Sequence, residues 1–180
     1  MDFNNFDSRT AADEGRPMHI KHPATGELMW NDDGPKHDDD GNELPRSNPC
    51  RVYVYGTEGN VAQEAFREAA KLDKLDDAAT MADYHERLCV TARKLVAGFE
   101  NVNNGDRPAT VGDAAWFLNL NTSSPLKGRE GQSFAEQVLQ FSGTRGQYLG
   151  KPEADLSPPR IKSAGSARGR KNGSSRAAKI

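Results

Sequence analysis

The segment Arg51-Val-Tyr-Val-Tyr55 is followed by Gly-Thr-Glu-Gly59 and then by a helical pattern that begins at Asn60. β-branched and aromatic residues dominate the first five positions, which is typical of a strand, and Gly56 ends it. From Asn60 the apolar spacing is helical, and Asn60 and Gln63 match a capping box. The apolar positions of this helix are Val61, Ala62, Ala65, Phe66, Ala69 and Leu72. This change from strand to helix predicts an α+β chain.

Two shorter strands are predicted before this one. Residues 17–22 alternate weakly between apolar and polar side chains, and Pro23-Ala-Thr-Gly26 is typical of a turn in which Gly26 has positive φ. Glu27–Trp30 continues as the second arm of a hairpin. Residues 31–49 are polar and acidic and are predicted to form a long exposed loop. The sequence therefore predicts a small N-terminal antiparallel β unit of about three strands over residues 16–56.

About four helices are predicted over residues 60–150. The second helix spans Ala78–Phe99, and the third is short and capped by Thr110. A predicted turn at 103–106 separates the second helix from the third, and a predicted loop at 120–131 separates the third helix from the last. Ser133 and Glu136 form a capping box at the start of the last helix, which Gly150 and Pro152 end. The expected apolar faces are Met81, Tyr84, Leu88, Leu95 and Phe99; Val111, Ala114, Phe117 and Leu118; and Phe134, Val138, Phe141, Tyr148 and Leu149.

Charge and composition divide the chain into one domain and a tail. The 180 residues carry 24 Lys and Arg against 26 Asp and Glu, and 35% are hydrophobic, which is below the 45–50% of ordinary globular chains. Residues 151–180 are basic, rich in Ser, Gly, Ala and Pro, and almost without large apolar side chains. Such a segment cannot bury enough surface to offset the entropy of ordering. We therefore predict one α+β domain over 1–150 and a disordered basic tail over 151–180.

No pattern in the sequence predicts a metal or cofactor site. His19 and His22 are three residues apart, which puts them on opposite faces of a strand, where they are expected to face solvent. Asp38-Asp39-Asp40-Gly41 lacks the ligands at both ends of an EF-hand loop, so a solvated acidic loop is favoured over a weak cation site. The strand–glycine–helix junction at Gly56 lacks the phosphate-binding glycine patterns, and Glu58 would repel a phosphate.

No catalytic constellation is predicted either. His85 precedes Cys89 by one helical turn, but neither an orienting acid nor an oxyanion site accompanies them. Cys50 and Cys89 are expected to be reduced thiols, because two cysteines make no disulfide scaffold and the acidic N-terminus does not resemble a signal peptide. A redox or metal pair is the alternative for these thiols. The chain is therefore interpreted as a non-enzyme of the cytoplasm, without a membrane span.

Three segments together resemble the tail assembly chaperones of long-tailed bacteriophages. The first, Glu14–Glu27, is a short strand entering an HPxTGE turn, and the second, Arg51–Glu58, leads into a helix rich in Ala, Arg and Lys. The third contains Phe134–Phe141 and Arg145–Gly150, similar to the family's V-x-x-F…R-x-x-[FY]-L ending. Leu95–Val102 is similar to the middle of such proteins. The resemblance covers about residues 7–150, although the acidic insertion at 31–49 has no counterpart in it.

This resemblance implies a small β unit before a helical region and a non-enzymatic role in tail morphogenesis. Such chaperones bind the helical tape measure protein, help to recruit tail tube subunits, and are usually absent from the finished virion. The host cytoplasm is then the expected location. Self-association is left open, and neither a membrane nor nucleic acid is expected as a partner.

The last helix is the expected partner surface. The side chains that would contact the partner are Phe134, Val138, Phe141, Tyr148 and Leu149. The alternative interpretation is that this apolar stripe is simply core, because a helical stripe usually is. Gly143 and Gly146 lower the intrinsic stability of this helix by about 1 kcal/mol each relative to Ala.

Two other functions compete with the chaperone hypothesis. A structural virion component, such as a head–tail connector or minor tail protein, would share the small domain and the basic arm but remain in purified particles. A nucleic-acid-binding regulator would use the basic tail, with affinity that falls steeply with salt. The tail lacks interleaved aromatic residues for stacking on bases, which disfavours the second alternative.

Overall fold

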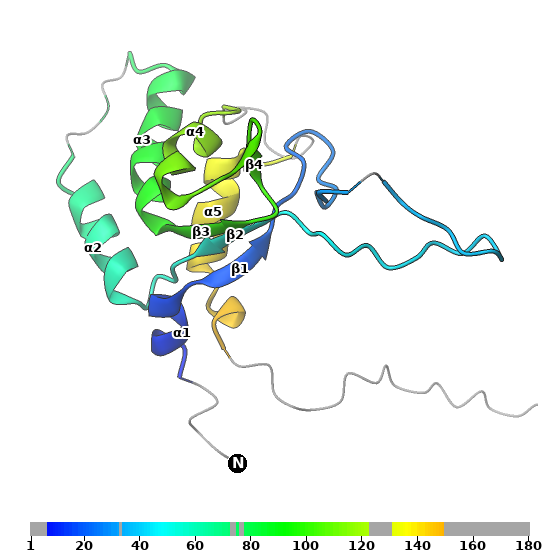
Figure 1. The fold of residues 1–180 in the computed structure, drawn as a ribbon. Coiled ribbons are helices and arrows are strands. Elements are labelled where there is room, and N and C mark those ends of the chain that lie inside the picture. The colour runs from blue at the N-terminus through cyan, green and yellow to red at the C-terminus, as the bar shows by residue number, and fades with distance from the viewer. Residues whose placement is uncertain (1–6, 33, 73–74, 76–77, 123–130, 150–180) are drawn as a thin grey trace, which may run out of the picture. The chain divides into compact units, whose positions relative to one another are not determined.

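The computed structural model describes residues 7–32, 34–72, 75, 78–122 and 131–149, and it confirms the α+β class (Figure 1). Strands β1 (Arg16–His19), β2 (Arg51–Val54) and β3 (Val96–Glu100) form one antiparallel sheet in the order β1-β2-β3. Val52 pairs with Met18 on one side and with Phe99 on the other. The sheet is therefore built around the strand that the sequence marks most clearly.

One face of this sheet is buried and the other is polar. Val52 and Val54 are fully buried, whereas Arg51 and Tyr53 alternate with them and are half-buried. On the polar face, both Arg51 and the Tyr53 hydroxyl donate to the Glu100 carboxylate at 3.1–3.2 Å. This alternation is the period of two expected for a strand with one face against the core.

The prediction of a strand at Glu27–Trp30 is wrong, and the third strand of the sheet is instead β3, which comes from the end of the segment predicted as the second helix. The chain does reverse at the predicted turn: the His22 N–H donates to the Glu27 carbonyl at 2.7 Å, and Gly26 has a φ of 75°. Beyond it, Leu28 forms only an isolated bridge and is 47% exposed. Backbone hydrogen bonds of Met29 with Ile20 and Cys50 hold this arm in place, but they do not form the continuous ladder of a strand.

Five α-helices surround the sheet in the described part of the chain. They are α1 (Arg9–Glu14), α2 (Asn60–Ala69), α3 (Met81–Leu95), α4 (Ala114–Leu118) and α5 (Phe134–Gly143). One 3-10 helix, Val111–Asp113, precedes α4, and another, Arg145–Gln147, follows α5. The short strands β4 (Asn103–Asn104) and β5 (Arg107–Pro108) form a hairpin at the predicted turn. Helix α1 was not expected from the sequence.

Helix α3 is shorter than the predicted helix Ala78–Phe99, and the face that it buries is largely different from the face expected. It begins at a capping box of Thr80 and Asp83, and it ends at Leu95 because Val96 enters β3 and pairs with Val54. Met81 and Tyr84, expected in the core, are 42% and 49% exposed. The side chains that α3 buries are His85, Cys89, Thr91, Ala92 and Leu95, of which only Leu95 was expected on the apolar face.

Helix α2 begins as predicted, but its cap is different. Gly59 is the N-cap, and Asn60 donates its N–H and its side-chain amide to Asp13, so the predicted Asn60–Gln63 capping box is wrong. Only Ala62 and Ala65 of α2 are buried. Val61, Phe66 and Leu72, which share the expected helical spacing, are exposed. An acid from α1 therefore takes the role that the sequence assigned to a local pair.

The predicted capping box of Ser133 and Glu136 is confirmed at α5, but this helix ends at Gly143 rather than at Gly150. Gly143 and the following Gly146 are the residues with the weakest helical preference here, so the ending agrees with their propensity. Thr110 caps the short helical segment before α4, as expected. Ala114, Phe117 and Leu118 are buried there, whereas Val111 is 52% exposed.

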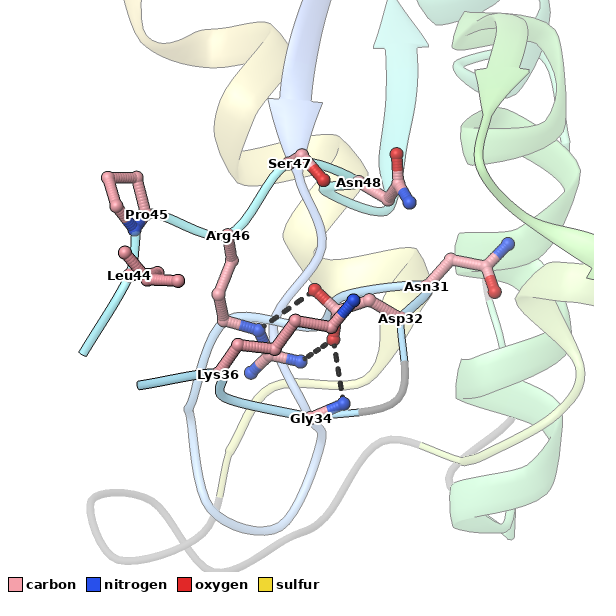
Figure 2. A pocket seen from close by; sticks show the side chains of 9 residues that line it. All are labelled: Asn31, Asp32, Gly34, Lys36, Leu44, Pro45, Arg46, Ser47 and Asn48. Carbon is pink, nitrogen blue, oxygen red and sulfur yellow. Dashed lines mark hydrogen bonds and ion pairs between the residues drawn. The ribbon is translucent and has the colours of Figure 1, made fainter. Parts of the chain in front are cut away.

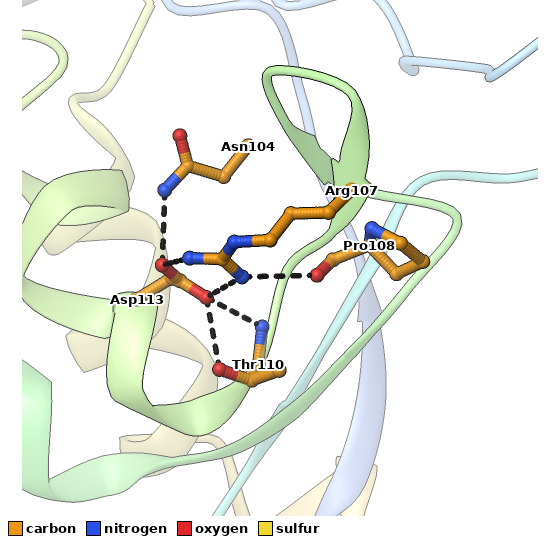
Figure 3. A network of polar contacts seen from close by, with 5 residues as sticks. All are labelled: Asn104, Arg107, Pro108, Thr110 and Asp113. Atoms are coloured by element: carbon orange, nitrogen blue, oxygen red, sulfur yellow. Dashed lines mark hydrogen bonds and ion pairs between the residues drawn. The ribbon is translucent and has the colours of Figure 1, made fainter.

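Asp113 ties the β4–β5 hairpin to α4 (Figure 3). Arg107 donates to both of its carboxylate oxygens, at 2.6 and 2.8 Å, and Asn104 and Thr110 donate at 2.9 Å. The Arg107 hydrogen bonds, followed by those from Thr110 and Asn104, hold the pKa of Asp113 far below its usual range. This carboxylate therefore stays ionised in the folded protein under all ordinary conditions.

The Asp113→Asn variant is expected to have a Tm several degrees lower than the wild type at pH 7. Because the folded-state pKa of Asp113 is depressed, its contribution to stability is complete above the ordinary value of 3.8 and is lost as the pH falls further toward the folded-state pKa. The Tm difference should consequently shrink between pH 5 and pH 2, as thermal unfolding followed by circular dichroism would measure. A difference that stays constant over this range would contradict the assignment.

Residues 31–32 and 34–49 of the acidic segment form a long and mostly exposed loop, as predicted, and Figure 1 shows an extended excursion there. The predicted disordered tail 151–180 lies outside the described residues. Among the helices that the structure describes, none has the length and apolarity that a bilayer crossing requires.

Candidate functional site

Four of the five residues predicted to bind a partner contact the protein's own core in this structure. Phe134, Val138 and Tyr148 are 6%, 0% and 2% exposed, and Phe141 and Leu149 are half-buried. Phe134 and Val138 belong to the main core with the sheet, α3 and α4, whereas Phe141 packs edge-to-face on Tyr148 at 5.8 Å. Their role toward a partner stays a prediction, and the conformation described leaves them little free surface.

Tyr148 connects the segment after α5 to the sheet through a hydrogen bond. Its hydroxyl donates to the Val54 carbonyl at 3.0 Å, and burial raises the pKa of this phenol above its usual range. A Cβ on Gly56 would lie 2.9 Å from the Tyr148 ring and 2.8 Å from the Ala12 side chain. Because Gly56 has no side chain, α1 and Tyr148 can pack closely against this strand–helix junction.

The same junction is closed to phosphate. Asp13 occupies the N-terminal end of α2, where a phosphate would bind. Glu58 is engaged by Ser8 and by an ion pair with Arg145. Two of the chain's own carboxylates therefore surround the position that an anion would need.

The histidines expected to face solvent take structural roles. His19 is half-buried, lies 2.7 Å from the Met29 carbonyl and packs edge-to-face on Trp30 at 4.8 Å. His22 is exposed, and its Nδ1 accepts the N–H groups of Ala24 and Thr25, which closes the turn. Among the described residues, no three His, Cys, Asp or Glu side chains gather as a metal site would require.

Asp32 organises the base of the acidic loop (Figure 2). It accepts hydrogen bonds from the Arg46 guanidinium and from the Gly34 N–H, and the Arg46 bond lowers its pKa. Arg46 in turn lies 5.2 Å from the centroid of the Trp30 ring. At the loop's tip, Asp38 accepts from the backbone of Asp40 and Asn42, and these bonds lower its pKa as well. The acidic residues thus shape a turn of the chain.

His85 and Cys89 face each other on one turn of α3, as expected. The Cys89 sulfur lies 3.3 Å from His85 Nε2, and both side chains are buried. Burial raises the pKa of the Cys89 thiol, which favours the protonated and poorly nucleophilic form. This pair has the environment of a structural thiol.

The pocket with the most suitable chemistry for a partner is apolar and contains both tryptophans of the chain, Trp30 and Trp116. Its volume is about 300 Å³, which accommodates one or two apolar side chains. None of its lining residues is charged. The others are Ile20, Met29, Asn31, Cys50, Asn101, Val102, Asn103, Phe117, Leu120 and Phe134. We call this site the tryptophan pocket.

The walls of the tryptophan pocket are held by the packing around them. Phe117 stacks on Phe134 at 4.5 Å and meets Phe99 edge-on at 5.2 Å, so the floor is an aromatic cluster. Trp30 is positioned by His19 and Arg46. Cys50 donates its S–H to the Asn101 carbonyl at 3.2 Å, and burial raises the pKa of this thiol. At the mouth, Leu120 is 52% exposed.

Of the residues predicted to bind a partner, the pocket includes only Phe134. Trp30 and Trp116 were not predicted as site residues, because neither belongs to a sequence motif. The signal available was their residue type, since tryptophan is enriched where proteins bind one another.

Comparisons of the whole chain with protein-family models, with curated proteins and with solved structures found no match.

Proposed function

We propose that this protein is a tail assembly chaperone of a long-tailed bacteriophage, and that it acts without catalysis. In this proposal it binds the tape measure protein and helps to bring tail tube subunits to it in the host cytoplasm. Two features support the proposal: the sequence resemblance over residues 7–150, and the uncharged tryptophan pocket. The pocket is the observation that carries the binding role.

The tryptophan pocket suits an apolar side chain presented by a partner helix. An amphipathic helix docks by inserting anchor residues from one face into a hydrophobic groove. Trp30 and Trp116 supply large, half-buried apolar surfaces of the type that dominates binding energy. The amides of Asn31 and Asn103 at the lining add polar groups without charge. A long helical protein that aggregates when unshielded carries many such apolar anchors.

The direct test is co-expression with the tape measure protein from the same phage genome, followed by pull-down. We expect a soluble complex, with the tape measure protein insoluble when it is expressed alone. A bait recovered alone, with the partner still insoluble, would overturn the proposal. Mass spectrometry of purified virions adds a second test, because a chaperone should be absent from them and a structural component present.

The Leu120→Glu variant is expected to weaken tape measure binding at least tenfold. A carboxylate at the mouth of an uncharged apolar pocket must be desolvated when an apolar anchor enters. Because Leu120 is already 52% exposed, the substitution should leave folding intact. Val111→Glu is the matched control, since Val111 is also 52% exposed but lies outside the pocket.

Tryptophan fluorescence gives the binding measurement, because both tryptophans of the chain line the pocket. A titration with tape measure peptides should shift the emission of the wild type and of Val111→Glu, and shift that of Leu120→Glu only at much higher concentration. Equal affinities for the two variants would place the contact elsewhere.

A further inference from the structure

The outer side of α3 carries a stripe of exposed residues with opposite charges along it. Ala82, Glu86, Val90 and Arg93 are all exposed, and all line one cleft between α3 and α4. Their spacing of three to four residues keeps them on one helical face. We call these four residues the α3 stripe.

The charged residues of the α3 stripe are Glu86 and Arg93. Neither Glu86 nor Arg93 forms an ion pair with any residue that the structure describes, whereas the neighbouring Lys94 is paired with Glu68 and Asp83 is used in the α3 cap. Between the charges, Val90 is 44% exposed. An exposed valine flanked by an unpaired acid and an unpaired base is a surface that can complement itself.

We propose that the α3 stripe pairs with the α3 stripe of a second copy of this chain, in antiparallel orientation. In a two-fold dimer each contact occurs twice, so Glu86 of each copy meets Arg93 of the other. The midpoint between these residues lies beside Val90, which puts the two valines together at the axis. Parallel pairing would instead oppose Glu86 to Glu86 and Arg93 to Arg93.

The residue at the axis allows the helices to approach. Val90 is compact, which permits the helix spacing of about 8–10 Å typical of packed helices. One helix pair buries little surface compared with a stable interface, so the dimer should be reversible and concentration-dependent. Its ion pairs are solvent-exposed, so salt should weaken it.

This dimer and the tryptophan pocket use different surfaces. The cleft at the α3 stripe and the tryptophan pocket share no lining residue. A dimer would therefore offer two pockets to one long partner, which raises the overall affinity through effective concentration. The proposal of a dimer stands without the chaperone function, and its test needs no phage partner.

Sedimentation analysis of five samples tests the proposal: wild type, Glu86→Arg, Arg93→Glu, an equimolar mixture of these two variants, and the double variant. Each variant alone puts like charges opposite each other twice, and should raise the dimer dissociation constant at least tenfold. In a heterodimer of the two variants, one copy carries arginine at both positions and the other carries glutamate at both. Opposite charges then meet at each contact, so dimers should return in the mixture. The double variant Glu86→Arg/Arg93→Glu should dimerise like the wild type.

A wild type that stays monomeric at all concentrations and salt levels would overturn the proposal. So would single variants that dimerise as well as the wild type, or a mixture of them that remains monomeric. Circular dichroism of each variant checks that the fold is kept. The tape measure pull-down with the monomeric variants separates the two proposals, because loss of the dimer leaves the tryptophan pocket intact.

Discussion

Replacement of Phe117 by alanine is expected to lower the free energy of unfolding by about 3–5 kcal/mol, the range for removing a buried phenylalanine. Phe117 is 2% exposed and lies between two other rings, stacked on Phe134 and edge-on to Phe99. These rings come from α4, α5 and β3, so the cavity would open where two helices meet the sheet. The loss is a large fraction of the 5–15 kcal/mol that stabilises a typical domain.

Urea unfolding followed by circular dichroism measures this effect. Val111→Ala is the control, because Val111 precedes the same helix but is 52% exposed and should change the free energy of unfolding by less than about 0.5 kcal/mol. A loss below about 1 kcal/mol for Phe117→Ala would mean that the aromatic cluster is not packed as described. The same variant should also weaken partner binding, since Phe117 lines the tryptophan pocket.

The Gly131→Ala variant is expected to destabilise the protein by about 1–3 kcal/mol, the usual cost of overpacking. A Cβ on Gly131 would overlap the Pro23 carbonyl oxygen, and would lie 2.5 Å from the Pro23 carbonyl carbon and 3.0 Å from the His22 oxygen. All three atoms belong to the backbone of the turn that follows β1. They cannot rotate away as a side chain would, so the segment before α5 must move.

Gly143→Ala is the matched control, because a Cβ there would meet nothing within 4 Å. Gly143 is the last residue of α5, where alanine has the higher helical propensity, so this variant should be neutral or slightly stabilised. Thermal unfolding of the two variants side by side distinguishes the effects. If Gly131→Ala melts at the wild-type temperature, then the close approach to the turn at Pro23 is wrong.

The tryptophan pocket shows what sequence patterns cannot reveal. Trp30 lies immediately before the acidic loop and Trp116 in α4, and no spacing or motif connects them. They meet because the loop returns to the sheet at Cys50, and Phe117 of α4 packs on Phe99 of β3 and Phe134 of α5. The apolar stripe of α5 was predicted from its helical period. The period alone does not show whether the protein's own core or a partner covers the stripe.

Local sequence alone determined those features whose partners are a few residues away. The turn at Gly26 and the capping box of Ser133 and Glu136 are of this kind, because the atoms that satisfy each other are close in sequence. Tertiary structure decided the end of α3 at Leu95. Val96 can continue a helix or enter a strand, and only the unpaired edge of β2, more than 40 residues away, makes the strand the better choice.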